Sequence, residues 1–269
     1  MRNVTIPAST GSDLDLSPRP GDVSLVVVSP PATDCHHRPA RPKPVAPPAR
    51  VELVDTPTWP PADVRLHVDG LVLQLPDEAR LTELGALAAA GVHGEDEMPF
   101  TQPWTVGTGA DRARRTVQYH WQVRGAWTPQ RWCWPVVALQ DGVVVAMQEL
   151  SAHDLPVLRE VATGSWVGRE HQGRGIGTRM RAAVLSFALG TLGAEHATTE
   201  AFEDNAASIA VTRRLGYRPD GEDRLVRQGR PVRSLRFRLR AEGFSSPWPV
   251  RVEGWSAACA TAFGLVGEA

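Results

Sequence analysis

The chain has 269 residues, of which 42% are hydrophobic and 22% are charged, and its 29 basic residues nearly balance its 30 acidic ones. These fractions are typical of a globular protein in water, and the balanced charge argues against a nucleic-acid binder, which would carry a basic surplus or stripe. Three widely spaced cysteines, the lack of a signal-peptide pattern and apolar runs too short to cross a bilayer predict a cytoplasmic protein that binds no membrane.

Residues 1–62 differ in composition from the rest of the chain. They hold 13 of its 23 prolines, and no aromatic residue precedes Trp59. Such a segment buries too little apolar surface to offset the entropy of ordering, so we expect a largely disordered tail in which Val23–Ser29 is a candidate strand. The Cys35-His36-His37 cluster has no second pair of ligands at finger-like spacing, so we predict no metal site.

Hydrophobic periodicity and turn residues define the elements that follow the tail. The predicted domain spans residues 63–242. Its first half begins with a strand or hairpin at Val64–Leu75 and a helix from Pro76-Asp77 to Gly91, whose apolar stripe is Leu81, Leu84, Leu87 and Ala88. After a loop come a helix from Asp111 to about Trp127, strands at Pro135–Leu139 and Val143–Leu150 around the turn Gln140-Asp141-Gly142, and an extended segment at Pro156–Val167.

A glycine-rich turn and a long amphipathic helix come next. The remaining elements are that helix at Gly175–Leu189, a strand at His196–Ala201, a helix at Asn205–Leu215, a strand at Val232–Leu239, and a small strand and helix within Pro249–Phe263, inside a C-terminal extension over residues 243–269. Because a long crossover helix requires parallel neighbouring strands, this order predicts a mixed α/β sheet.

The most informative segment is the turn itself, where the spacing is Gln172-x-x-Gly175-x-Gly177. Free backbone N–H groups at a helix N-terminus bind phosphate, and the bare glycines let the backbone approach it closely. A P-loop would need a lysine that this turn lacks. A dinucleotide fingerprint would need a third glycine at Thr178, so a nucleotide-dependent oxidoreductase is a weaker alternative. A turn with a purely structural role is the remaining alternative.

The spacing of this turn resembles the coenzyme A loop of the GNAT superfamily of N-acyltransferases. The motifs that carry the resemblance are QLP (Gln74–Pro76), MPFTQPW (Met98–Trp104), TGSWVG (Thr163–Gly168), RMRAAVL (Arg179–Leu185) and DNAASIAV (Asp204–Val211). These motifs resemble an actinobacterial group that includes a mycobacterial succinyl-CoA-using transferase, and the resemblance spans about Asp63 to Phe263. It implies a strongly twisted mixed sheet of six to seven strands flanked by helices.

The resemblance also implies a V-shaped opening beside the strand Glu160–Val167, where the pantetheine arm of acetyl-CoA or succinyl-CoA would bind. The residues expected to bind the donor are Trp166, Val167, Gln172, Gly173, Arg174, Gly175, Ile176, Gly177, Thr178, Asn205 and Ser208. Glu200 is the expected general base, with Glu160 and Glu149 as alternatives. Many members carry a tyrosine as the acid at the position of Thr212, so Ser208 is the expected acid here.

For the acceptor, the sequence offers an aromatic-rich set. The expected acceptor residues are Phe100, Trp104, His120 and Trp121, although most of the nine tryptophans should be core residues. The acceptor is expected to be a primary amine of a peptide, a protein or a small molecule. A non-catalytic acyl-CoA-binding regulator is the alternative function, and a homodimer stays open.

Overall fold

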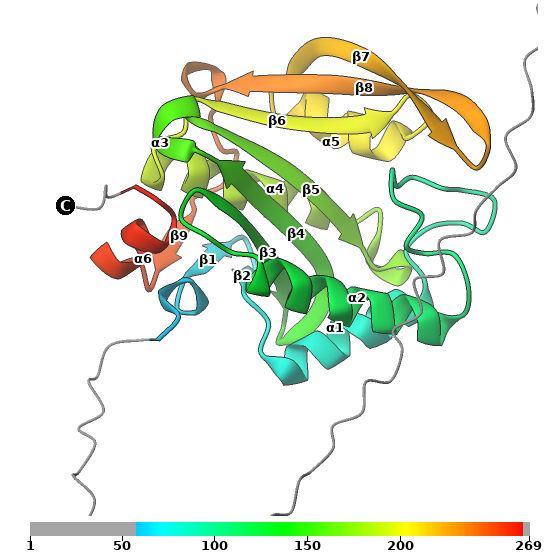
Figure 1. Cartoon of the computed structure of the whole chain (residues 1–269), viewed down its shortest axis with the longest axis horizontal. Coiled ribbons are helices and arrows are strands. Elements are labelled where there is room, and N and C mark those ends of the chain that lie inside the picture. The colour runs from blue at the N-terminus through cyan, green and yellow to red at the C-terminus, as the bar shows by residue number, and fades with distance from the viewer. Residues whose placement is uncertain (1–57, 266–269) are drawn as a thin grey trace, which may run out of the picture. The chain divides into compact units, whose positions relative to one another are not determined.

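The computed structural model describes residues 58–265, so Val23–Ser29 and the Cys35-His36-His37 cluster lie outside the described residues. Within them, nine strands form one mixed sheet in the order β7-β8-β6-β5-β4-β3-β2-β1-β9 (Figure 1). The predicted fold class is confirmed, with nine strands instead of the six or seven expected. None of the helices described is long and apolar enough to cross a membrane.

Residues 58–265 contain nine strands and six α-helices. The strands are β1 (Arg65–Val68), β2 (Leu71–Gln74), β3 (Arg131–Gln140), β4 (Val143–His153), β5 (Glu160–Val167), β6 (His196–Phe202), β7 (Arg218–Arg227), β8 (Arg230–Arg240) and β9 (Arg251–Glu253). The helices are α1 (Glu78–Ala90), α2 (Gly109–Gly125), α3 (Leu155–Leu158), α4 (Ile176–Ser186), α5 (Ala206–Arg214) and α6 (Ala257–Ala262).

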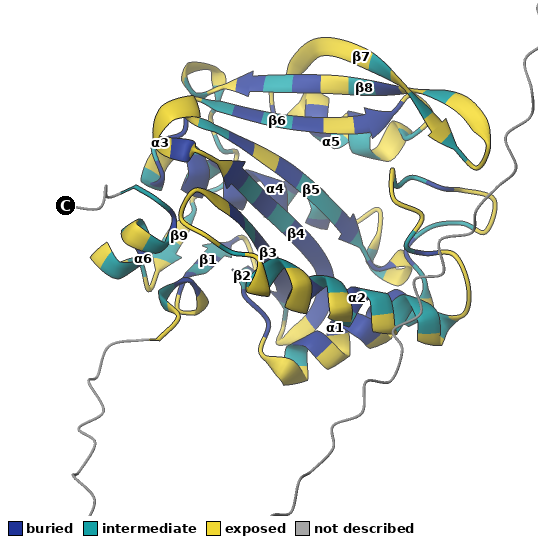
Figure 2. Cartoon of the chain, in the orientation of Figure 1, coloured by how far each residue is buried: buried dark blue, intermediate teal, exposed yellow. Residues whose placement is uncertain are grey.

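Two helical layers cover the two faces of the sheet (Figure 1). The α1–α2 layer packs on β3 and β4, and the α4–α5 layer packs on β1, β4, β5 and β6 from the other side. Side chains alternate between the layers, so Trp134 and Val136 join the core beneath α4, while Val137 and Met147 join the core beneath α1. Figure 2 shows the buried residues concentrated along the central strands.

Strands β5 and β6 are the one parallel pair among the described residues. They pair only where Glu160–Ala162 lies beside His196–Thr198. Beyond that point β5 stays paired with β4 as far as Val167, and β6 stays paired with β8 as far as Phe202. The two strands therefore separate toward their C-terminal ends and leave one edge of β5 without a neighbouring strand.

Two elements differ from those expected. Pro156 lies in α3, where proline is compatible with the first helical turn, so the strand begins only at Glu160. Strand β7 was not expected, because its sequence RPDGEDRLVR carries charges, Pro and Gly instead of an alternating apolar pattern. It forms the exposed outer strand of the sheet, where backbone pairing with β8 replaces burial as the stabilising interaction.

The C-terminal segment completes both the sheet and one core. Strand β9 pairs with β1, and the fully buried Phe263 lies edge-on to the rings of Trp127, Trp132, Trp134 and Phe187. The indole N–H groups of Trp127 and Trp132 donate to the backbone carbonyls of Ala262 and Phe263 at 2.9 and 3.1 Å. Several tryptophans are therefore core residues.

We predict that Phe263→Ala lowers the free energy of unfolding by about 3–5 kcal/mol, because it empties a fully buried aromatic site. Guanidinium unfolding followed by tryptophan fluorescence measures the change. The control is Val226→Ala on β7. Because the Val226 side chain is 77% exposed, this substitution should lower the free energy of unfolding by no more than about 0.5 kcal/mol. Equal losses in the two variants would show that the C-terminal helix does not belong to the core.

Candidate functional site

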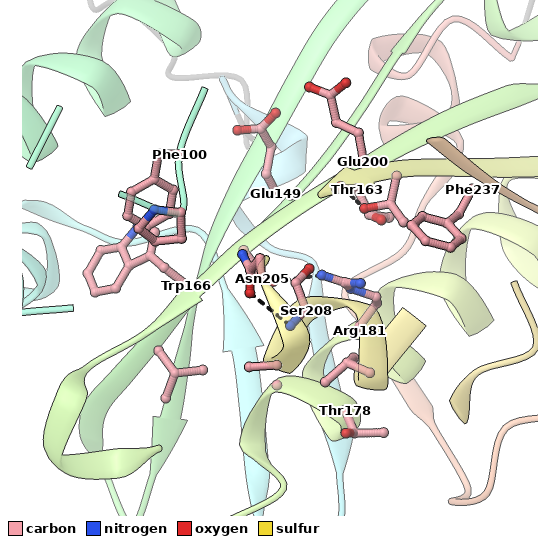
Figure 3. Close-up of a pocket in the computed structure, with 18 of the residues that line it drawn as sticks. Phe100, Glu149, Thr163, Trp166, Thr178, Arg181, Glu200, Asn205, Ser208 and Phe237 are labelled. Carbon is pink, nitrogen blue, oxygen red and sulfur yellow. Dashed lines mark hydrogen bonds between the residues drawn. The ribbon is translucent and has the colours of Figure 1, made fainter. Parts of the chain in front are cut away.

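A cavity of about 950 Å³ opens where β5 and β6 separate. It is lined by β5, β6 and β8, by the glycine turn, by the start of α5, and by the loop that follows α1 (Figure 3). This cavity collects most of the residues that the sequence singles out. Those that line it are Phe100, Glu149, Glu160, Trp166, Val167, Gln172, Gly173, Gly175, Ile176, Gly177, Thr178, Glu200, Asn205 and Ser208.

The glycine turn leaves room for an anion at the start of α4. Gly173 and Gly175 have φ angles of +74° and +75°, which glycine adopts without strain, and a Cβ at either position would meet no atom within 4 Å. Gly175 is the residue that precedes the helix, so the first N–H groups of α4 have no intrahelical acceptor and open toward the cavity. The turn has the form of a phosphate-binding cradle.

Gln172 holds this cradle in place instead of facing the anion. Its Nε2 donates to the carbonyls of Val92 and Val167 at 2.8 and 2.9 Å. Arg174 is exposed and does not line the cavity, so its charge is available only at the outer rim of the turn. The Gln172 side chain thus joins the loop after α1 to the end of β5, and its role in binding the donor stays a prediction.

The start of α5 faces the cavity from the side of α4. The side-chain oxygen of Asn205 accepts a hydrogen bond from the backbone N–H of Ser208 at 3.1 Å, which caps the helix. The hydroxyl of Thr212 donates to the carbonyl of Ser208 at 2.8 Å and is fully buried. Thus Ser208 presents a hydroxyl to the cavity, whereas Thr212 lies beneath it.

Three carboxylates lie on the opposite side of β5 from Ser208. Figure 3 shows Glu149 on β4 and Glu200 on β6 pointing to this side. Glu160 forms an ion pair with Arg238, which neutralises its charge. Glu200 is exposed and accepts no hydrogen bond from any side chain in the described part of the chain. Of the three, Glu200 is therefore the carboxylate most available to accept a proton.

A tyrosine that the sequence does not single out holds Glu149. The hydroxyl of Tyr119 on α2 donates to the Glu149 carboxylate, and the Sγ atom of Cys133 lies 3.6 Å from the same hydroxyl. Burial, reinforced by the neighbouring Cys133 and Glu149, raises the pKa of Tyr119, so its hydroxyl stays protonated and keeps donating. No sequence pattern links residues so far apart on a helix and a strand.

An aromatic wall borders the cavity on the side of the carboxylates. Phe100 packs against Trp104 and Trp104 against Trp166 as tilted ring pairs, with ring centroids 5.1 and 5.6 Å apart, and Phe100 and Trp166 line the cavity. His120 and Trp121 lie elsewhere: His120 is fully buried, and Trp121 is 53% exposed on the outer face of α2. The helical spacing of α2 turns both residues away from the cavity.

A buried arginine lines the cavity on the side of α4. Arg181 is 3% exposed, and its guanidinium donates to Thr212 Oγ1 at 2.9 Å and to Ser165 Oγ at 3.1 Å. The signal that would have identified it is its position within the apolar face of α4, four residues after Gly177 and four before Leu185. A charged residue on a core-facing stripe requires a polar partner or a ligand.

Comparisons with known proteins agree with this geometry. A sequence profile described as "Acetyltransferase (GNAT) domain" matches residues 73–218, more than half of the chain. The fold is similar to Mycobacterium smegmatis RimJ in complex with CoA-disulfide, at 22% identity over 68% of this chain and 90% of that chain, with a TM-score of 0.55.

Two further solved structures are similar in fold. RimL, a ribosomal L7/L12 alpha-N-protein acetyltransferase in complex with coenzyme A, is 15% identical over 65% of this chain and 98% of that chain, with a TM-score of 0.52. Ribosomal-protein-S5-alanine acetyltransferase from Vibrio fischeri is 14% identical over 68% of this chain and all (100%) of that chain, with a TM-score of 0.53. At these identities the likenesses establish the fold alone.

We predict that His120→Phe weakens the pH dependence of stability. Burial and the charge of Arg124 lower the pKa of His120 from 6.5 to about 3, and neither ring nitrogen has a hydrogen-bond partner. Between these values the unfolded chain binds more protons than the folded one, so stability falls as the pH drops below 6.5, by up to about 1.4 kcal/mol per pH unit.

Guanidinium unfolding at about pH 7 and about pH 5 measures this effect. Between these two pH values, the free energy of unfolding should fall less in His120→Phe than in the wild type. The control is His153→Asn, an exposed histidine at the end of β4, which should keep the wild-type loss. If all three proteins lost the same stability, His120 would not be a buried neutral histidine.

Proposed function

Since the chain belongs to the GNAT acetyltransferase family, we propose that it transfers a short acyl group from an acyl-CoA to a primary amine, by direct attack within a complex of both substrates. One observation carries this proposal. A phosphate-binding glycine turn and the unpaired edge of a strand open into the same cavity, whose opposite side carries a free carboxylate.

The residues present fit a coenzyme A thioester. The cradle around Gly173 and Gly175 suits the pyrophosphate, and the free edge of β5 suits the amide groups of the pantetheine arm. The N–H of Gly168 donates to Val145 on β4 at 3.0 Å, so by strand alternation the N–H groups of Ser165 and Val167 face the opening. When bound, the thioester supplies the activated acyl carbon.

The carboxylate side of β5 is where we place the amine. An ammonium must lose a proton before it can act as a nucleophile, and the unpartnered Glu200 is the proposed proton acceptor. Before that proton is lost, Glu149, which accepts a hydrogen bond from Tyr119, is proposed to bind the ammonium group. The N–H of Ser165 is the proposed donor to the oxygen that becomes negative as the amine attacks.

The departing thiol needs a partner on the side of α5. The Ser208 hydroxyl, which lines the cavity, is the proposed hydrogen-bond donor to it. Thr212 is buried and occupied with Arg181 and the Ser208 carbonyl, so it does not serve as a proton donor. A weak acid such as a serine hydroxyl stabilises a thiolate less well than a charged group does.

The acceptor that we propose is the N-terminal amine of a peptide or protein, with a small-molecule amine as the alternative. The names of RimL and of the S5-alanine enzyme support a protein acceptor. Both acetyl-CoA and succinyl-CoA are candidate donors, the second because of the motifs shared with the actinobacterial group. Cys133 and Cys259 are free thiols, which suits a reaction in the reducing cytoplasm.

A thiol-release assay tests the proposed function. The full chain is mixed with acetyl-CoA or succinyl-CoA and a panel of peptide and small-molecule amines. Amine-dependent release of coenzyme A is the expected result. Binding of coenzyme A without turnover on any amine would favour a regulatory acyl-CoA-binding protein, and absence of binding would overturn both functions.

We predict that Gly175→Asp weakens coenzyme A binding at least tenfold, because it adds a negative charge where the pyrophosphate would bind. The matched control is Gly229→Asp in the β7–β8 turn. Both glycines have a φ of +75° and open space at the Cβ position, so both variants carry a similar backbone strain of about 1–2 kcal/mol. Calorimetric titration showing equal affinity in both variants would exclude the glycine turn as the phosphate site.

We predict that Glu200→Gln lowers kcat by about 10²- to 10⁴-fold while leaving the KM for acyl-CoA unchanged, because the variant cannot accept the proton of the amine. Glu149→Gln should mainly raise the KM for the amine. The control is Glu203→Gln, in the turn after β6, which pairs with Arg233 outside the cavity. Steady-state kinetics in which Glu149→Gln loses kcat and Glu200→Gln does not would reverse the two roles.

A further inference from the structure

The guanidinium of Arg181 spans the base of the opening between β5 and α5. Nη1 donates to Thr212 on α5 at 2.9 Å, and Nη2 donates to Ser165 on β5 at 3.1 Å. Figure 3 shows Arg181 on the same side of β5 as Ser208. It thus lies beside Ser165, the residue whose N–H faces the opening, and is linked through Thr212 to the carbonyl of Ser208.

This guanidinium has no anionic partner among residues 58–265. Its side-chain partners there are the hydroxyls of Thr212 and Ser165 and no carboxylate, and its Nε is buried without a hydrogen-bond partner. The titratable group that faces it is Tyr217, whose own hydroxyl lies 3.3 Å from Thr163 Oγ1 and whose pKa is raised by burial. Arg181 therefore faces a neutral phenol, and burial lowers its pKa without removing the proton.

A buried cation that bonds only two neutral hydroxyls is incompletely compensated. Of the five N–H donors of the guanidinium, two are used. Since Arg181 lines the cavity, a molecule bound there could supply the negative charge that residues 58–265 do not. The pyrophosphate would bind at the N-terminus of α4, six residues away and about 9 Å along the helix, and is already served by the helix N–H groups.

Apart from the pyrophosphate, the negative charge in the proposed reaction develops on the sulfur of the departing thiol. We place the thioester carbonyl at the N–H of Ser165, with the sulfur on the side of α5. The hydroxyl-bearing residues that line the cavity are Thr163, Thr178, Ser165, Thr198, Thr199 and Ser208, with Thr101 from the loop after α1. They are weak donors, whereas a guanidinium gives a charge-assisted hydrogen bond.

We propose that Arg181 forms a thiolate-binding subsite and stabilises the leaving group as an anion, so that no proton donor is required. This inference rests on the proposed function. The ammonium proton first passes through Glu200, which is exposed, to solvent. In the step, the neutral amine nitrogen forms a bond to the acyl carbon, and the second proton that it then releases passes to Glu200. The carbon–sulfur bond breaks, its electron pair stays on sulfur, and the thiolate leaves paired with Arg181, which keeps its own proton.

The test measures how the thiol of bound coenzyme A ionises, which requires no acceptor amine. The full chain is titrated with pH while the ultraviolet absorbance of the thiolate is recorded, and desulfo-CoA supplies the baseline. Near an opposite charge the thiol pKa should fall by about 1–3 units below that of free coenzyme A. In Arg181→Met this fall should disappear, and in Arg181→Lys it should be partly retained.

Affinity separates this role from a structural one. Arg181→Met should bind desulfo-CoA like the wild type but lose about tenfold or more of its affinity for coenzyme A at a pH where the bound thiol is ionised. Loss of about 10²–10³-fold in kcat with every acyl donor is expected.

Three results would overturn the proposal. They are an unshifted thiol pKa in the wild type, an equal loss of desulfo-CoA binding in the variant, and a loss confined to donors that end in a carboxylate, which would assign Arg181 to the acyl group. The wild-type measurement stands even if the variants do not fold. If the wild type bound neither coenzyme A nor desulfo-CoA, that result would instead reject the proposed function.

Discussion

The site depends on how β5 pairs with its two neighbours. Its hydrogen-bonded ladder with β4 continues to the end of the strand, whereas its ladder with β6 stops early. The first ladder has six residue pairs and the second three. Backbone groups left without a partner are costly unless a ligand or solvent satisfies them. The glycine turn at the end of β5 and the start of α5 both adjoin this unpaired edge, so one departure from regular pairing provides the cavity and its backbone donors.

The two sides of β5 carry opposite chemistry because strand side chains alternate. Glu149 and Glu200 lie on the face covered by α1 and α2, and Arg181 and Ser208 lie on the face covered by α4 and α5. A reaction across the strand would release a proton on the carboxylate face and collect negative charge on the guanidinium face. Under the proposed function, separating the two sites by a strand keeps the proposed base from pairing with the guanidinium.

Local signals were sufficient for much of the fold, including the glycine turn. Asp141-Gly142 forms the expected turn with φ angles of +52° and +79°, and Gly175 directly precedes α4, close to the helix start that its spacing indicates. Strand β7 escaped prediction because its stability comes from a neighbouring backbone and leaves no trace in its own hydrophobic pattern. Tyr119 and Arg181 were missed because their partners lie on other elements, so tertiary contacts alone define them.

The segment after β5 is joined at three points to the end of α1 and the loop that follows it. The N–H of Arg169 donates to the carbonyl of Gly91 at 3.0 Å, Gln172 bonds the carbonyl of Val92, and Leu87 packs so closely on Gly168 that a Cβ there would lie 2.3 Å from it. Both segments line the cavity. Under the proposed function these contacts would couple the binding of the two substrates, and thermodynamic reciprocity requires that such coupling act equally in both directions, whichever substrate arrives first.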